Sequence, residues 1–351
     1  MFGAERLSSG KGLRGSDFSN SAPSRDATGG SDSRANPALR HVYGPVPSRR
    51  LGRSLGVDLV PFKTCSYDCV YCQLGRTTCK TVERREWVAI EEVKSELDVA
   101  LAAPTEPDFV TLSGSGEPTL NSGIGELIRW LKRRTRVPVA VLTNSSLLWL
   151  PEVCEALAEA DLVVPSLDAA DSASFRYANR PHPSIGFELM LEGLVAFARS
   201  YRGRLWLEVL LLDGVTGIPE EVSAIARLAR RIGPERVDLG TVTRPPAEDF
   251  ALPVPRPKLL RLRHLFEPPA VVAAERAPSA ARADQAAGAA RVLELLGRRP
   301  CTLRDLAVGL GAPENEVLKA LARLQWAQLV RHDQRGGERF YRAVRPPEAG
   351  A

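Results

Sequence analysis

The sequence predicts an α/β fold, a parallel sheet surrounded by helices, followed by a small helical module. Short apolar runs alternate with helical stretches from His41 to about Pro269. Most of the apolar runs carry Val or Leu on both faces, as expected for a parallel sheet that is buried on both sides. The 351 residues suffice for a main domain of about 200–250 residues and one further module.

Six strands and five helices are expected in the main domain. The strands are expected at residues 54–60, 108–114, 138–144, 161–167, 204–212 and 236–242. The helices are expected at residues 90–103, 124–134, 151–160, 185–200 and 219–232. This alternation predicts a partial (β/α)6 barrel that is similar to the TIM barrel. A doubly wound open sheet is the alternative that the pattern allows.

Composition changes at both ends of the main domain, which we assign to residues 41–269. Residues 1–40 are rich in Ser, Gly, Asp and Arg, and we expect a disordered tail. Residues 270–285 are rich in Ala and Pro and are expected to form a linker. In residues 286–345, three helical stretches precede a hairpin with Gly336-Gly337 at its turn. Three helices and a hairpin predict a winged helix-turn-helix domain.

The overall composition predicts a globular cytoplasmic protein. Hydrophobic residues make up 44% and charged residues 25%, which is ordinary for globular chains. No apolar run reaches the roughly 20 residues of a membrane span, and the first residues lack the apolar stretch of a signal peptide. We therefore expect no membrane partner. The formal net charge is +5, and residues 286–345 carry eleven Lys and Arg against six Asp and Glu. The basic character thus belongs to the ends of the chain.

Three of the six cysteines form a C-x-x-x-C-x-x-C motif at Cys65, Cys69 and Cys72. Three thiolates on one short loop can reach three corners of a four-iron cluster, which normally takes four Cys ligands. An iron without a protein ligand has an open position, as catalytic metal sites do. The alternatives are a zinc ion or an electron-transfer cluster.

The spacing of these cysteines resembles that of the radical S-adenosylmethionine (SAM) superfamily, and the resemblance covers residues 42–266. It implies a [4Fe-4S] cluster whose open iron is chelated by the methionine group of SAM. It also implies reductive cleavage of SAM to a deoxyadenosyl radical, with an external electron donor of flavodoxin or ferredoxin type. Tyr71 stands where the family has an aromatic residue near the adenine.

The segment SGSGEPTL resembles the family's glycine-rich segment, which meets the ammonium group of SAM. Gly114, Ser115, Gly116 and Glu117 occupy that place. Glycines let a backbone approach a ligand closely, and a carboxylate pairs with a cation. By the same resemblance, Asn144 and the pair Ser166 and Asp168 are expected to contact the ribose and carboxylate of SAM. The alternative is that these polar residues cap the following helices.

The opening VYGPVPSRRLGRSLGVDLVPFKTC and the phrase YCQLGRT resemble radical SAM enzymes related to those that synthesise wyosine in tRNA. Those enzymes carry a second cluster on upstream cysteines, whereas no cysteine precedes Cys65 here. The substrate is therefore not carried over from the resemblance.

Basic residues near the expected strand ends are the candidates for substrate contact. Arg49, Arg50 and Arg53 precede the first strand and could meet an anion, the alternative being surface salt bridges. Arg180 and His182 follow the fourth strand and could line the substrate side. Cys79 could donate hydrogen as a thiol, although a bystander role is the alternative.

In the C-terminal module, Lys319 and Arg323 share one face of the expected recognition helix. The hairpin adds four arginines at positions 331, 335, 339 and 342. This surface suits contact with a nucleic-acid backbone. The function predicted is radical modification of an unknown substrate, possibly RNA. A peptide- or protein-modifying enzyme and an iron–sulfur redox-sensing DNA-binding regulator are the rival functions.

Overall fold

An eight-stranded sheet, in which the strands follow one another in chain order, forms the centre of the molecule. The computed structural model describes residues 40–48, 50–104, 106–272 and 288–344. The sheet comprises β1 (Val42–Ser48), β2 (Gly52–Asp58), β5 (Phe109–Ser113), β6 (Val139–Thr143), β7 (Leu162–Pro165), β8 (Arg204–Leu211), β9 (Arg236–Thr241) and β10 (Val271–Val272). Only β1 is antiparallel to its neighbour. Because a doubly wound sheet reverses its strand order at one point, that alternative is excluded.

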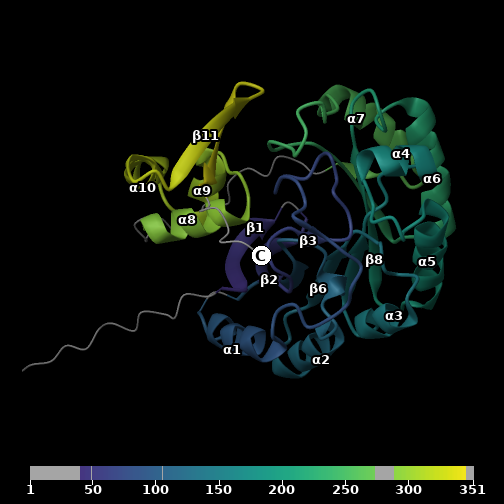
Figure 1. The fold of residues 1–351 in the computed structure, drawn as a ribbon, viewed down its shortest axis with the longest axis horizontal. Helices are drawn as coiled ribbons and strands as arrows, with labels where there is room; N and C mark the ends of the chain where they lie inside the picture. Colours follow the sequence, from purple (N-terminus) through teal and green to yellow (C-terminus); the bar gives the residue numbers. More distant parts are fainter. Residues whose placement is uncertain (1–39, 49, 105, 273–287, 345–351) are drawn as a thin grey trace, which may run out of the picture. The chain divides into compact units, whose positions relative to one another are not determined.

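Helices connect the parallel strands and cover the outer side of the sheet (Figure 1). The five predicted helices are α1 (Ile90–Leu101), α2 (Ile124–Arg134), α3 (Pro151–Leu157), α5 (Phe187–Ser200) and α6 (Pro219–Ile232). Two further short helices, α4 (Ser172–Ala178) and α7 (Arg256–Leu262), were not predicted. Each has seven residues, too few for the apolar pattern to repeat clearly, although Asp171 and Ser174 form a capping box at α4.

The two faces of the sheet belong to different apolar clusters. Val110, Val139 and Val163 face the helices in the main core, while their neighbours Ala140 and Leu162 face the other side. On that inner side they pack with Trp206 of β8. This period-two arrangement explains why the strands are apolar at nearly every position.

The edges of the sheet extend beyond the predicted strands. β1 forms a hairpin with β2 that the sequence analysis did not anticipate. At the other edge, β10 pairs with β9, so the first residues of the predicted 270–285 linker belong to the sheet. The linker prediction was wrong there because a two-residue strand leaves no periodic signal.

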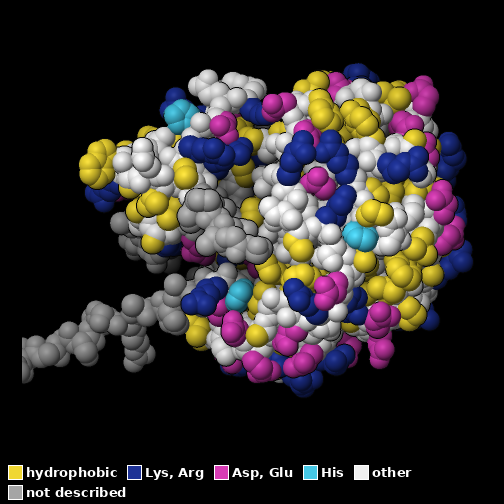
Figure 2. Space-filling view, viewed as in Figure 1, with side chains coloured by type: hydrophobic (Ala, Val, Ile, Leu, Met, Phe, Trp, Pro, Cys, Tyr) yellow, Lys and Arg dark blue, Asp and Glu magenta, His cyan; other side chains and the backbone are white. Residues whose placement is uncertain are grey.

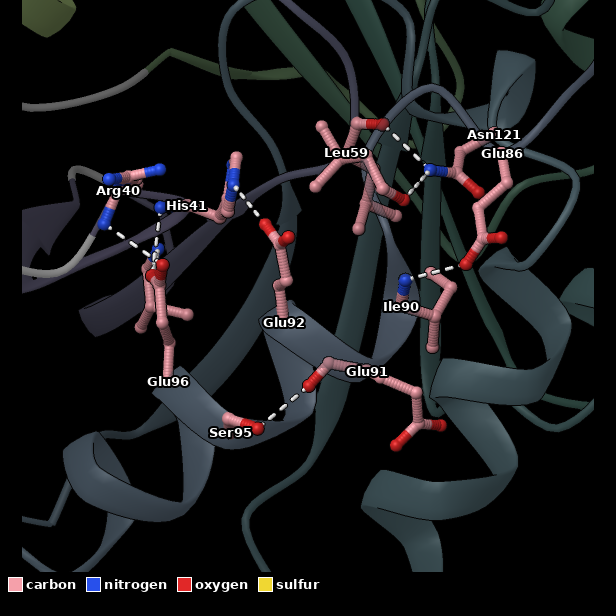
Figure 3. Close-up of polar contacts among 12 residues, drawn as sticks. Arg40, His41, Leu59, Glu86, Ile90, Glu91, Glu92, Ser95, Glu96 and Asn121 are labelled. Carbon is pink, nitrogen blue, oxygen red and sulfur yellow. Dashed lines mark hydrogen bonds and ion pairs between the residues drawn. The ribbon is translucent and has the colours of Figure 1, made fainter.

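Side chains from α1 and from the segment after β5 fix the loops around the sheet (Figure 3). The Glu96 carboxylate of α1 accepts hydrogen bonds from the backbone nitrogens of Arg40, His41 and Val42, where β1 begins. The Asn121 amide donates to the carbonyl oxygen of Leu59 at 2.8 Å and to that of Val88 at 2.9 Å. Asn121 therefore holds the chain that leaves β2 toward the cysteine motif.

The C-terminal unit has the element order that the sequence predicts. It contains α8 (Ala289–Arg298), α9 (Leu303–Leu310), α10 (Glu314–Trp326), β11 (Val330–Arg335) and β12 (Glu338–Ala343). Its own apolar cluster includes Val292, Leu306 and Leu321. Gly336 and Gly337 have φ values of 56° and 81°, as a tight hairpin turn of type I′ requires.

Three predictions lie wholly or largely outside the described residues. They are the disordered tail, apart from Arg40, the contact of Arg49 with substrate, and the linker from residue 273 onward. No helix in the described part of the chain combines the length and apolar character that crossing a bilayer requires.

Candidate active site

The cysteine loop follows β2, and buried apolar side chains anchor it. Tyr67 is 2% exposed, and its ring packs edge-on against Phe175 with 5.4 Å between centroids. Val70 is fully buried in a small cluster with Ala178 and Leu212. The residues between the cysteines thus fix the loop, while the three cysteines stay partly exposed.

Two neighbouring segments hold the backbone of the loop. On one side, the Lys63 nitrogen donates to the Ser115 carbonyl at 2.7 Å, beside the glycine-rich segment after β5. On the other side, the Val70 nitrogen donates to the Ala178 carbonyl at 2.9 Å. The His182 nitrogen donates to the Ser66 carbonyl at 2.8 Å. The loop is therefore fixed between the segments that follow β5 and α4.

Each cysteine sulfur has at least one polar side chain nearby with a hydrogen to donate. The Lys63 ammonium lies 3.2 Å from the Cys72 sulfur. The amide nitrogen of Asn144 lies 3.5 Å from the Cys65 sulfur, and that of Asn179 lies 3.6 Å from the Cys69 sulfur. Donors to sulfur stabilise thiolates and tune a cluster bound through them.

The surroundings of two of the thiols, Cys65 and Cys69, oppose their ionisation. Burial, with the Glu117 carboxylate as the next contribution, raises the pKa of Cys65 to about 12. Burial also raises the pKa of Cys69. Thiols must lose their protons to bind iron, so the positive charge of the metal has to stabilise the thiolates.

The cysteines suit a cluster better than a single ion. No group of three His, Cys, Asp or Glu side chains in the described ranges converges as one metal ion requires. A zinc ion needs its sulfurs within about 2.3 Å of one point. A four-iron cluster takes one thiolate on each iron, so its ligands need not converge. Three thiolates on one loop therefore suit three irons of such a cluster.

The glycine-rich segment needs its glycines because other groups approach the backbone. Gly114 has φ +110°, and a Cβ there would overlap the Asp58 carboxylate. A Cβ on Gly116 would overlap the carbonyl oxygen of Thr64. The Asp58 carboxylate also accepts a hydrogen bond from the Ser115 nitrogen at 2.6 Å. The segment consequently packs directly against the chain entering the cysteine loop.

Glu117 is 1% exposed, and its two carboxylate oxygens accept four hydrogen bonds. Oε1 accepts from the nitrogen and hydroxyl of Thr119 and from the hydroxyl of Thr143. Oε2 accepts from the Asn144 nitrogen at 2.7 Å. Burial raises the pKa of Glu117, and these donors oppose the rise. Glu117 thus joins the ends of β5 and β6, a structural role beside the predicted contact with SAM.

Tyr71, Asp168 and Asn179 form a hydrogen-bonded network beside Cys69. The Tyr71 hydroxyl donates to the Asp168 carboxylate, and the Asn179 amide lies 3.0 Å from the Tyr71 oxygen and 3.1 Å from the Asp168 oxygen. The Leu210 nitrogen donates to the other Asp168 oxygen. Burial raises the pKa of Asp168 to about 6, although these hydrogen bonds oppose the rise.

The polar residues at the strand ends come together around a small cavity of about 10 Å³, roughly one water in size. Asn144, Ser166 and Asp168 line it, together with Tyr67 and Asn179. The side-chain oxygens of Tyr67 and Asn179 are buried without a hydrogen-bond partner in the described structure. The cavity therefore presents unsatisfied polar atoms next to the cysteine loop.

The residues predicted on the substrate side do not form one group. Arg50 pairs with Glu208 of β8 at 2.7 Å, which fixes its guanidinium, and Arg53 pairs with Asp108 at the surface. Arg180 pairs with Glu248 at 2.5 Å. His182 lies near Arg180, and both line a second pocket.

Several predicted nucleic-acid contacts already have acidic partners. Lys319 pairs with Glu316 one turn earlier at 2.7 Å. On the hairpin, Arg335 pairs with Asp249, and Arg342 pairs with Asp333. Three of the six basic side chains predicted to contact nucleic acid are therefore already in ion pairs.

Sequence reasoning missed Lys63 and Asn179, the donors to Cys72 and Cys69. Lys63 stands two residues before the first cysteine, and a cation so close to a thiolate motif was a usable signal. Asn179 ends α4, 110 positions after Cys69, and only the fold brings the two together.

Comparison with known proteins identifies the class of protein. Residues 59–229 match the model of the radical SAM superfamily. A UPF0026 protein of Helicobacter pylori is 38% identical over 275 residues, which cover 77% of this chain and 87% of that protein. The chain therefore belongs to the same family as the UPF0026 proteins, and it carries a radical SAM domain. Enzymes of this superfamily use a [4Fe-4S] cluster and SAM.

Two further similarities cover parts of other proteins. A GTPase Obg of Brachyspira hyodysenteriae is 35% identical over 300 residues, which are 84% of this chain and 44% of that protein. This chain thus spans less than half the length of that relative. A radical SAM methyltransferase from Sphaerobacter thermophilus has a TM-score of 0.48 and 19% identity, with 62% of this chain and 65% of that chain covered.

Proposed function

We propose that Cys65, Cys69 and Cys72 hold three irons of a [4Fe-4S] cluster and that the chain binds SAM beside it. SAM would lie against the backbone of residues 114–116, with Tyr71, Glu117, Asn144, Ser166 and Asp168 around it. The arrangement that supports this is the cysteine loop, fixed between the glycine-rich segment and the Asn179 network. When bound and reduced, the cluster supplies the electron that breaks a carbon–sulfur bond of SAM.

The protein's own residues would orient the ligands and control their protons. Asn144 and Asn179 donate toward two sulfurs and Lys63 toward the third. The carboxylates of Glu117 and Asp168 are kept in place by backbone donors. Burial of these groups excludes water, which strengthens their electrostatic effect on a charged ligand.

The test is anaerobic purification of the full chain with measurement of iron, sulfide and visible absorption. We expect one four-iron cluster, and dithionite-reduced protein should convert SAM slowly into deoxyadenosine and methionine. Replacing the three motif cysteines by Ala should abolish the absorption and the cleavage together.

Replacing Cys79, Cys154 and Cys301 by Ala is the matched control and should preserve the cluster. The assignment of the ligands is wrong if the motif variant keeps its iron while the control loses it. A cluster without any SAM cleavage would instead favour the redox-sensing regulator.

We also propose that the C-terminal unit is a winged helix-turn-helix that positions the substrate of a partial (β/α)6 barrel, with RNA as the substrate. Residues 286–345 carry a formal net charge of +5, which favours an anionic partner. The rival proposal is a peptide or protein substrate. Sequencing the RNA and the peptides that copurify with the protein would distinguish the two substrates. Enzymes of this superfamily need an external electron donor, for which we propose a flavodoxin or ferredoxin.

A further inference from the structure

A second pocket of about 370 Å³ opens on the segment that carries Arg180. It is within the size range of sites for small ligands. Its lining comprises Lys80, Ser172, Phe175, Arg176, Arg180, Pro181, His182, Pro183, Ile185, Gly186 and Phe187. Three of these side chains are cationic, one is a histidine, and no carboxylate is among them. Lys and Arg side chains gather near α4 on the face that Figure 2 shows.

Two of the cations, Lys80 and Arg176, form no salt bridge in the described part of the chain, although the Asp171 carboxylate interacts electrostatically with Arg176. The Lys80 ammonium lies 3.4 Å from the carbonyl oxygens of Arg180 and Pro181. The Arg176 guanidinium donates to the Ser172 hydroxyl at 2.6 Å. Neutral oxygens orient the two side chains at the pocket.

The third cation, Arg180, shares its acidic partner. Glu248 pairs with Arg180 at 2.5 Å and with Arg76 at 2.8 Å, so one negative charge serves two positive ones. Arg180 also has φ +45°, a left-handed conformation that costs free energy for a residue with a side chain. A strained arginine beside an excess of positive charge is consistent with an anion-binding role.

The wall of this pocket is continuous with the cysteine loop. Asn179, which approaches the Cys69 sulfur, directly precedes Arg180. Pro181 forms a bridge with Tyr67, between the first two cysteines. Phe175 lines both this pocket and the small cavity beside Asp168. A ligand held by the cations would therefore lie next to the proposed reaction centre.

We propose that this pocket binds a phosphate group of the substrate through Lys80, Arg176 and Arg180. Arginine donors match the oxygens of phosphate in pairs, and a phosphate carries more charge than a carboxylate. Phe175, Ile185 and Phe187 add apolar surface for the group attached to the phosphate. The proposal rests on the proposed function, because it names the chemical class of that enzyme's substrate.

The test measures equilibrium binding to the anaerobically prepared full chain. The probes are inorganic phosphate, AMP, adenosine and a single-stranded RNA 12-mer. We expect AMP to bind, adenosine to bind much more weakly, and phosphate to compete with AMP. Lys80→Gln combined with Arg176→Gln should weaken AMP binding by at least about tenfold, since two charge-assisted contacts are lost. If AMP does not bind but RNA binding weakens in this variant, the phosphate site is also supported. The phosphate that it binds would then belong to RNA.

Arg133→Gln combined with Arg230→Gln removes the same charge from the exposed faces of α2 and α6 and is the control. The proposal is overturned if adenosine binds as well as AMP or if no phosphate probe binds. Equal losses in the two double variants would also overturn it, since bulk charge would then be the cause. Binding does not depend on turnover, so phosphate binding without SAM cleavage would refute the enzyme function but keep the pocket.

Discussion

Polar side chains are held differently around the cysteine loop and on the C-terminal unit. Beside the loop, Glu117 and Asp168 are 1% and 4% exposed, and every carboxylate oxygen accepts a hydrogen bond. On α10, Lys319 is exposed and pairs with a half-buried neighbour, Glu316. The loop region thus contains buried groups that hydrogen-bond to one another, whereas α10 carries charges that are exposed to solvent.

The comparison indicates where substitutions should have large effects. Removing one partner from a buried network leaves the others unsatisfied, at a cost of about 1–3 kcal/mol for each group. Removing one partner of a surface ion pair costs about 0–1 kcal/mol. Effects should therefore decrease from the segment that holds the cysteine loop to the surface of α10.

Glu117→Ala should have the largest effect of the single substitutions. It leaves the buried Thr119 and Asn144 nitrogens without an acceptor, so we expect the free energy of unfolding to fall by about 4 kcal/mol. The affinity of the cluster-bound protein for SAM should fall by about ten- to hundredfold, as for loss of a charge-assisted contact. Denaturant unfolding and equilibrium binding of SAM measure the two effects.

Glu155→Ala, which removes an exposed carboxylate from α3, is the control and should change neither quantity. A Glu117 variant that keeps its cluster and its full affinity for SAM would show that Glu117 has only the structural role.

Arg298→Gln should have the next largest effect, because it breaks a contact between α8 and the sheet. Arg298 pairs with Asp58, lies 4.5 Å over the ring of Tyr43 and donates to the Arg40 carbonyl at 2.8 Å. Asp58 is nearly buried, so we expect a loss of about 2–3 kcal/mol in unfolding free energy. Arg299→Gln is the control, and equal losses in the two variants would contradict the assigned ion pair.

Removing the C-terminal unit tests whether its contact with the sheet, made by Arg298 and Asp58, is needed for catalysis or only for stability. The shortened chain should end at Val272, since a chain ending at Pro269 would lose β10. It should still bind the cluster and cleave SAM, because every proposed ligand precedes Val242, yet lose activity on the substrate. If the shortened chain keeps its cluster but does not cleave SAM, the C-terminal unit is part of the catalytic site. Asp58 would then link the two, because it pairs with Arg298 of α8 and accepts a hydrogen bond from the Ser115 nitrogen.

Asn179→Ala should have a smaller effect on stability and a clear one on the cluster. We expect a loss of about 1–2 kcal/mol, since Asn179 donates to the buried Asp168 and Tyr71 oxygens. The reduced cluster should also change its electron paramagnetic resonance spectrum, because a donor to the Cys69 sulfur is lost. Asn315→Ala on α10 is the control, and an unchanged spectrum in the Asn179 variant would exclude a positioning role.

The sequence predicted the parts of the fold that repeat over many residues. α2 and α6 lie at the predicted residues because full turns of apolar spacing define them. The cysteine motif and the glycine-rich segment were found because their residues are close together in the chain. β1, β10 and Asn179 were missed, since pairing across the fold determines them. Asn179 and Cys69 show this most clearly, as no local pattern connects them.

The smallest effect is expected from replacing Lys319 and Arg323 by Ala on α10. If the C-terminal unit binds RNA, each phosphate contact contributes about 0.7–0.9 to the slope of log affinity against log salt concentration. Glu316 already pairs with Lys319, so Arg323 should contribute more, and the double variant should lower the slope by about one rather than two. Binding of the RNA 12-mer at several salt concentrations measures this slope, with Arg129→Ala on α2 as the control. A slope near zero in the unsubstituted chain would point to a peptide or protein partner. A slope that falls equally in the control would mean that α10 has no particular role, and that general surface charge attracts the RNA.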